Sequence, residues 1–118
     1  MQAATDERAE ALIVFDDTAI TQQRAPLLRL AAQHALPVAS IYKDLAEAGG
    51  LIAYGPSLPA LYQRAAYYVD RILQGAKPSE LPVERPMKLE LVINLKAAHA
   101  LGLTIPPDLL FQADTVIR

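Results

Sequence analysis

Cysteine and tryptophan are both absent from the 118 residues, and aromatic residues make up only 6% of them. Without cysteine the chain has no disulfide, no thiolate metal site and no cysteine nucleophile, although this absence does not identify a cellular compartment. No apolar run approaches the roughly 20 residues that cross a bilayer. Neither sign of charge dominates, since 11 basic and 13 acidic residues give a formal net charge of −2. Nucleic acid is therefore not an expected partner.

The sequence also lacks the motifs of several enzyme classes. It contains no G-x-G-x-x-G, no G-x-x-x-x-G-K-[ST] and no G-x-S-x-G, which argues against dinucleotide, phosphate-loop and nucleophile-elbow chemistry. Neither His34 nor His99 has a second histidine or cysteine at ligand spacing. We therefore expect no catalytic residue, no metal and no cofactor, and we predict that the chain is not an enzyme.

The N-terminal stretch, MQAATDERAEAL, is polar and has a helical pattern. A signal peptide begins with positive charge and continues with an apolar run, and this stretch has neither feature. The sequence leaves two alternatives open: a cytosolic protein, or a fragment of a longer exported precursor.

Three short apolar runs alternate with helical patterns along the first 75 residues. Residues 11–15 (ALIVF) are wholly apolar, which predicts a strand buried on both faces. Residues 36–41 and 51–54 predict two more strands, and helices are expected near 18–34, 43–48 and 57–74. This alternation predicts an α/β fold, a three-layer α-β-α open parallel sheet of the Rossmann-like kind with right-handed crossovers.

The amino-acid composition changes after Gly75. Four residues of the stretch 74–86 are glycine or proline, which indicates an extended connector. Residues 88–94 alternate, with Leu89, Leu91 and Ile93 against polar neighbours, and this predicts a half-buried or edge strand. We therefore predict an α/β lobe core at 1–75, followed at 76–118 by a crossover connector, an edge strand and C-terminal helices that pack on the same domain.

The last long helix of the core has an apolar stripe at helical spacing. Its members are Leu58, Leu61, Tyr62, Ala65, Val69, Ile72 and Leu73. Residues spaced in this way share one face of a helix. We expect that face to be buried.

Polar groups follow the carboxyl ends of the three predicted strands, where open parallel sheets bind their ligands. The candidate ligand-binding residues are Asp16, Asp17, Ser40, Tyr42, Tyr54 and Gly55. Carboxylates, hydroxyls and an aromatic face suit a small zwitterionic or polar molecule.

Each candidate also has a purely structural interpretation. An aspartate can cap the next helix, Ser40 and Tyr42 suit a turn, and Tyr54 suits a wall of the core. Gly49 and Gly50 are expected to end a helix rather than to bind phosphate.

The run at residues 47–56 (EAGGLIAYGP) resembles the ABC-transporter substrate-binding proteins of the tryptophan/tyrosine-transporter-like group, which have the type I periplasmic-binding fold. Four more segments agree in order and spacing: ALIVFD at 11–16, LYQRAAYYVDRILQGAKP at 61–78, LPVERP at 81–86 and LELVINLKAAHALGLTIP at 89–106. The resemblance covers nearly the whole chain, which is similar to the C-terminal part of such proteins.

The resemblance implies two α/β lobes that close over a ligand and are then offered to a membrane permease. This chain corresponds to part of one lobe, with residues 76–92 as a crossover between lobes. The ligand-side turns map by position to Asp16 and Asp17, to residues 40–42, and to Tyr54 and Gly55. The first turn reads Phe-Asp-Asp-Thr here, whereas relatives that bind amino acids have Thr-Asp-Asn.

We therefore expect a solute-binding component of an ABC transporter whose ligand is a small polar solute such as an amino acid. The full-length protein is expected in the periplasm or anchored as a lipoprotein outside the inner membrane. The alternative is a non-catalytic sensory or interaction domain of the same fold that self-associates, with a homodimer as its form. A small α/β enzyme is the third alternative.

Overall fold

The computed structural model describes residues 1–15 and 17–118, so Asp16 lies outside the described residues. The chain forms two compact units. Unit 1 consists of Met1–Gly55 and Glu90–Arg118, and unit 2 is Pro56–Leu89. The division predicted from the sequence, 1–75 and 76–118, has other bounds and stays a prediction.

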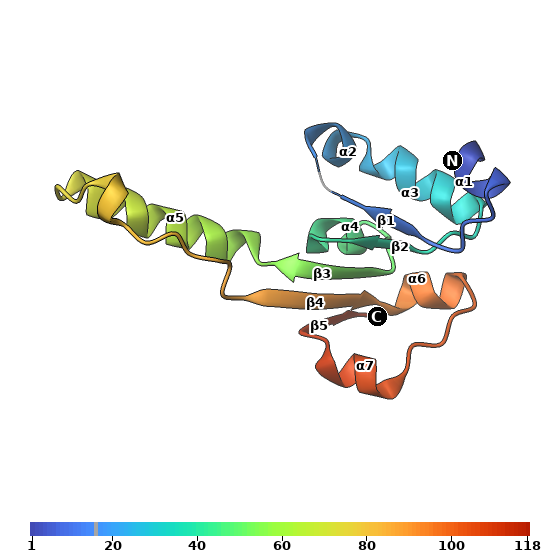
Figure 1. Ribbon diagram of the computed structural model, residues 1–118. Helices are drawn as coiled ribbons and strands as arrows, with labels where there is room; N and C mark the ends of the chain where they lie inside the picture. The colour runs from blue at the N-terminus through green and yellow to red at the C-terminus, as the bar shows by residue number, and fades with distance from the viewer. Residues whose placement is uncertain (16) are drawn as a thin grey trace. The chain divides into compact units, whose positions relative to one another are not determined.

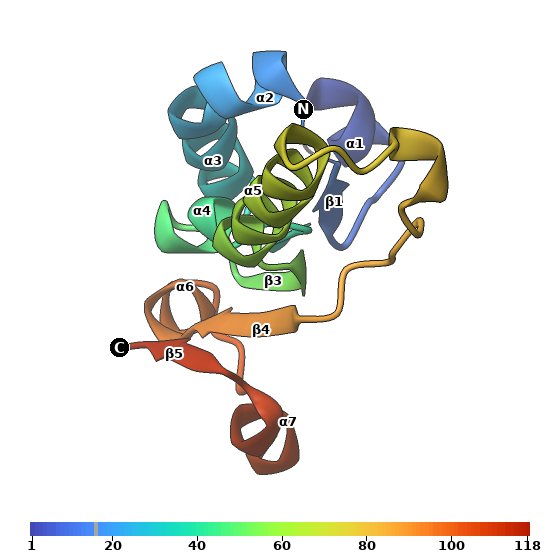
Figure 2. The ribbon, with the colours of Figure 1, turned by 90° about the vertical axis from the view of Figure 1, so that its left-hand side faces the viewer.

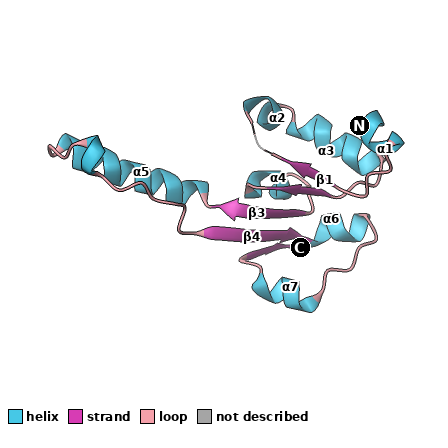
Figure 3. Ribbon diagram, in the orientation of Figure 1, coloured by secondary structure: helices cyan, strands magenta, loops and turns pink. Residues whose placement is uncertain are grey.

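A five-stranded sheet runs through unit 1 in the order β1-β2-β3-β4-β5 (Figure 1). The strands are β1 (Leu12–Val14), β2 (Val38–Ser40), β3 (Ile52–Pro56), β4 (Leu89–Asn94) and β5 (Thr115–Ile117). The pairs β1–β2, β2–β3 and β4–β5 are parallel, whereas the arrows of β3 and β4 point in opposite directions (Figure 3). The predicted α/β class is confirmed, and the expectation of a wholly parallel sheet is corrected at β3 and β4.

Short helices connect these strands. Unit 1 contains α1 (Gln2–Asp6), α2 (Thr18–Gln22), α3 (Arg24–Gln33), α4 (Lys43–Glu47), α6 (Leu95–Ala100) and α7 (Pro107–Gln112). Unit 2 contains α5 (Leu58–Leu73) and the 3₁₀ turn η1 (Pro78–Glu80). The helix predicted over 18–34 is therefore two helices, because the backbone of Gln23 leaves the helical region at φ −103° and ψ 14°.

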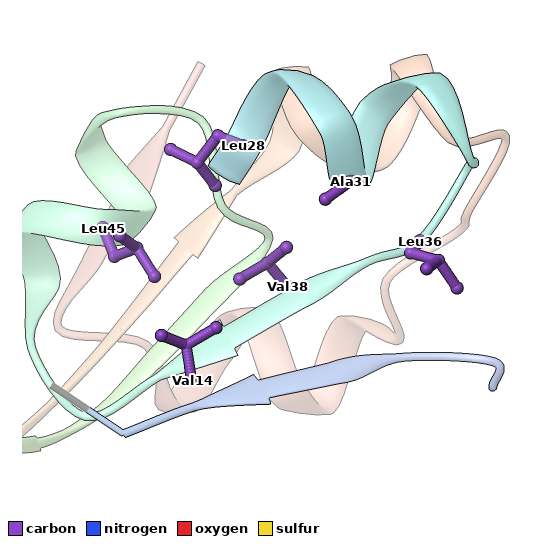
Figure 4. Close-up of a cluster of buried hydrophobic side chains, with 6 residues drawn as sticks. All are labelled: Val14, Leu28, Ala31, Leu36, Val38 and Leu45. Atoms are coloured by element: carbon purple, nitrogen blue, oxygen red, sulfur yellow. The ribbon is translucent and has the colours of Figure 1, made fainter. Parts of the chain in front are cut away.

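The core of unit 1 lies between the sheet and the helices α3 and α4. Its largest cluster consists of Val14, Leu28, Ala31, Leu36, Val38 and Leu45 (Figure 4). A second cluster joins Ala46 and Ala53 to Val92 of β4. Burial of each valine or leucine side chain contributes about 1.5–3 kcal/mol, so these clusters stabilise the packing of α3 and α4 on the sheet.

The expectation that β1 is buried on both faces is wrong. Val14 is only 8% exposed, but Ile13 is 72% and Phe15 is 73% exposed. Successive side chains of a strand point to opposite faces, and the core cluster contains Val14 but neither of these neighbours. The apolar run therefore forms a strand that is covered on one face only.

The description of β4 as a half-buried or edge strand is also wrong. It lies between β3 and β5 (Figure 2), and β5 was absent from the sequence prediction. Val92, Ile93 and Asn94 are 2%, 0% and 4% exposed, so the C-terminal half of β4 is buried on both faces. Asn94 is a buried polar residue and not part of a solvent-facing row.

The apolar stripe of α5 is not buried as expected. None of the residues of α5, all of which the structure describes, is buried. Tyr62, Val69 and Leu73 are 73%, 55% and 81% exposed. The amphipathic pattern correctly predicts the helix, but α5 belongs to unit 2 and its stripe remains open in this chain.

Within the described residues, five helices end in the same backbone motif, in which a residue of positive φ follows the helix. At the end of α4, Gly49 has φ 125°, its N–H donates to the Ala46 carbonyl, and the N–H of Gly50 donates to Leu45. This pair of bonds is the Schellman motif. It confirms the prediction that a glycine ends this helix.

The same motif ends α3, but the residue of positive φ there is Ala35, at φ 52°. The N–H of Ala35 donates to Ala32 and that of Leu36 to Ala31. An L-residue in this region costs roughly 1–2 kcal/mol, whereas glycine adopts it freely. We expect Ala35→Gly to raise the free energy of unfolding by up to about 1 kcal/mol. Urea denaturation checks this, and Ala32→Gly, inside α3, should instead destabilise by a similar amount.

Candidate functional site

The carboxyl ends of β1, β2 and β3 meet at one edge of the sheet. The register aligns Val14 with Ser40, and Ser40 with Ala53, so these three residues form one row across the strands. Neighbouring strands lie about 4.8 Å apart. The residues that follow this row come from three chain segments and form the candidate site.

Asp17 begins helix α2 after β1. Its backbone is extended, and its Oδ1 accepts the backbone N–H of Ile20 at 2.9 Å. The capping interpretation is therefore confirmed for Asp17. The side chain remains exposed, so its second carboxylate oxygen stays accessible to a cation or an ammonium group. The other acidic candidate, Asp16, lies outside the described residues.

Ser40 and Tyr42 shape the turn after β2. The Ser40 hydroxyl donates to the backbone carbonyl of Tyr42 at 2.9 Å, so its proton is engaged within the turn while its lone pairs remain available. Tyr42 has extended backbone angles and starts helix α4 without a side-chain cap. Both side chains are partly buried. The turn interpretation therefore holds for Ser40, and the role of either residue toward a ligand stays a prediction.

Tyr54 and Gly55 lie on β3 beside this turn. Tyr54 is 59% exposed, so it is not a wall of the core. Gly55 is buried, and a Cβ placed on it would lie 2.3 Å from the carbonyl oxygen of Ile41. Only glycine lets β3 approach the turn after β2 this closely. The site therefore depends on Gly55 for its shape and on Tyr54 for an open aromatic face.

Phe15 is a further aromatic residue at this edge that the sequence reasoning did not select. It follows β1 directly and is 73% exposed. Its position just before the acidic pair could have identified Phe15 as a site residue. It was not selected because the strand was expected to be buried on both faces. Phe15 and Tyr54 give the edge two exposed rings, and Asp17 and Ser40 supply oxygen acceptors. This combination suits a small molecule that carries both a polar and an apolar part.

Two of the hollows elsewhere in the described residues are lined by other side chains. A cavity of about 110 Å³ lies between α3 and α6, and its walls are apolar. An open groove of about 960 Å³ lies inside unit 2, between α5 and the segment that returns from it. Neither hollow is lined by a predicted site residue.

The part of the chain that the structure describes contains no group of three or more His, Asp or Glu side chains arranged to hold a metal ion. Within the same residues, no helix is both long and apolar enough to cross a membrane.

Comparisons with known proteins give one consistent result. The family described as ABC transporter substrate binding protein matches residues 1–117. A conserved domain protein from Vibrio cholerae is 29% identical with a TM-score of 0.89. An ABC domain from Streptococcus pneumoniae, solved in complex with L-Trp, is 27% identical with a TM-score of 0.88. The ligand-free, open structure of a substrate binding protein with adhesive properties from Clostridium difficile, at 19% identity and TM-score 0.67, shows the shared fold.

The matches cover nearly all of this chain but only a part of each solved chain. They cover 98%, 97% and 99% of this chain, but only 38%, 39% and 39% of the solved chains. No curated protein matches. The family match spans nearly every residue and agrees with the mixed α/β sheet and with the resemblance seen in the sequence. The chain therefore belongs to the family of ABC transporter substrate binding proteins.

Proposed function

We propose that this chain supplies one side of a solute-binding site for an ABC transporter, and that its ligand is an amino acid with an apolar or aromatic side chain. The observation that carries the proposal is the edge formed by Asp17, Ser40, Tyr54 and Gly55, with acceptors beside open aromatic rings. A carboxylate pairs with the ligand ammonium group. The exposed rings pack against its side chain.

The Streptococcus pneumoniae structure supports the amino-acid class, because its ABC domain was solved in complex with L-Trp. Its likeness to this chain extends over 97% of the residues. The candidate residues are not catalytic in this proposal, since binding and release need only contacts that differ between two states.

The proposed mechanism is lobe closure. The matched structures are about two and a half times as long as this chain, which corresponds to 38–39% of them. A second lobe would provide the remaining contacts, and the ligand would favour the closed form by binding it more tightly. In the full-length protein, the closed form would then dock on a membrane permease outside the inner membrane.

A chain that provides one side of the site should bind its ligand weakly. We expect titration of L-Trp, L-Phe or L-Leu into ¹⁵N-labelled chain to shift the amide signals of residues 17, 40–42 and 54–55, with a Kd on the order of millimolar, or about −4 kcal/mol. Tyr54→Ala should abolish these shifts. As a matched control, Tyr62→Ala removes an even more exposed tyrosine, from α5, and should leave these shifts unchanged.

Two results would count against the proposal. Shifts confined to residues away from the three strand ends would remove the site from this edge. Micromolar affinity for the chain alone would show that a second lobe is unnecessary, so the half-site mechanism would be wrong.

A further inference from the structure

Unit 2 consists of the helix α5 and a return segment that carries no regular structure after η1. We call residues 82–88 the strap. Its seven residues are exposed and two of them are proline, so they have little packing of their own. At the base of the unit, the backbone N–H of Ser57 donates to the carbonyl of Lys88 at 3.2 Å.

Arg64 of α5 holds the middle of the strap. Its Nε donates to Oε2 of Glu84 at 2.6 Å, and its Nη2 donates to Oε1 of the same carboxylate. This two-bond fork is the strongest geometry available to an arginine–carboxylate pair. The guanidinium carbon also lies 4.1 Å from the ring centre of Tyr67 and 5.2 Å from that of Tyr68. One side chain of the helix therefore binds a strap residue while two rings fix its orientation.

Tyr68, on the same face of α5, forms a second link between the helix and the strap. Its hydroxyl donates to the carbonyl of Pro82 at 2.5 Å. Its ring meets that of Tyr67 edge-on, with the centroids 5.8 Å apart. The rings, the guanidinium and the carboxylate therefore form one connected group that spans the helix and the strap.

Packing alone gives the strap little support. The helix residues that face it are Ala60, Leu61, Arg64, Ala65 and Tyr68, which share one side of α5 by their spacing. Two of them are alanines, and the groove between helix and strap stays open at about 960 Å³. Val83 and Met87 of the strap are almost fully exposed. The polar group around Arg64 is therefore the main link between the two segments.

We propose that Arg64, Glu84, Tyr67 and Tyr68 form a clasp that makes α5 and the strap a single rigid element, so that opening the clasp frees the strap from the helix. This inference is independent of any ligand and of the proposed transport role.

The charges of the clasp make it sensitive to salt and acid. The hydrogen bonds from Arg64 lower the pKa of Glu84 below its ordinary value. A lowered carboxylate pKa means that the pair is complete above the unfolded pKa and is lost as the pH falls through the folded one. The other charged groups at this groove are the basic side chains of Arg85 and Lys88. High salt screens such a partly exposed pair.

The absence of cysteine permits a direct test. Cysteines introduced at Gln63 of α5 and at Val83 of the strap, both exposed, are the only sites for spin labels. Pulsed electron paramagnetic resonance then gives the distribution of distances between the spin label on the helix and the one on the strap. We expect a narrow distribution in the parent, and one broadened roughly twofold or more in Arg64→Met, because local opening becomes favourable. Acidification below the pKa of Glu84 should broaden the parent in the same way.

A matched control and a reciprocal variant keep the test decisive. Arg71→Met makes the same change two turns along α5 and should leave the distribution narrow. The charge exchange Arg64→Glu with Glu84→Arg should restore a narrow distribution, provided that circular dichroism shows the helix content of the parent. If Arg64→Met stays as narrow as the parent, or if Arg71→Met broadens equally, the clasp is wrong and packing holds the strap.

Discussion

Replacing Gly55 by alanine is expected to destabilise the chain by about 3 kcal/mol or more. The added Cβ would lie 2.3 Å from the carbonyl oxygen of Ile41 and 2.8 Å from its Cγ2. The first of these atoms belongs to the backbone, so the clash cannot be relieved by turning a side chain. Relief requires β3 to move away from the turn after β2, which breaks the candidate site as well as the packing. Urea denaturation followed by circular dichroism measures the loss.

Gly102→Ala is the matched control for this experiment. Gly102 has φ 67°, and nothing lies within 4 Å of the Cβ that alanine would add. Its cost is therefore the conformational cost alone, about 1 kcal/mol. If Gly55→Ala proved no more damaging than Gly102→Ala, the close approach of Gly55 to Ile41 would be wrong. Comparing Gly55→Ala with Gly102→Ala therefore separates the cost of a steric clash from the cost of an unfavourable backbone conformation.

The features that were predicted correctly are those set by nearby residues. The end of α4 is an example, because the bonds that close it run from Gly49 and Gly50 to carbonyls only three and five residues earlier. The position of β3 follows for the same reason, since the glycines before it and Pro56 mark its limits. The family resemblance rested on this same run of residues.

The errors arise where a distant segment decides the outcome. β4 was described as an edge strand because its neighbour β5, Thr115–Ile117, is three residues long and begins 21 positions after Asn94. The stripe of α5 is a valid amphipathic pattern, but a pattern does not say what covers it. In the same way, Phe15 was assigned to a buried strand because an apolar run does not reveal which face lacks a helix.

Asn94 carries the second large expected effect, since Asn94→Leu should cost about 3 kcal/mol. The residue is 4% exposed. Its Nδ2 donates to the carbonyl of Ala46 at 2.9 Å, and its Oδ1 accepts the N–H of Ala97 at 3.1 Å. Leucine has the same branched arrangement of side-chain heavy atoms but satisfies neither group. Loss of the cap on α6 costs about 1 kcal/mol, and a buried carbonyl without a donor adds about 1–3 kcal/mol.

Asn94→Asp tests the two bonds separately. The aspartate keeps an oxygen for the N–H of Ala97, but its second oxygen faces the Ala46 carbonyl, and its charge would be buried. Burial and this repulsion should raise its pKa in the folded state, so the folded protein holds the proton more tightly than the unfolded one. Stability should then fall as the pH rises above the unfolded pKa of about 3.9 and recover in acid.

As a control for Asn94→Leu, Asp17→Ala, which removes an exposed cap, should cost only about 1 kcal/mol. If Asn94→Leu matched that smaller loss, Asn94 would be a cap and nothing more, and the bond that ties β4 to α4 would not contribute to the fold.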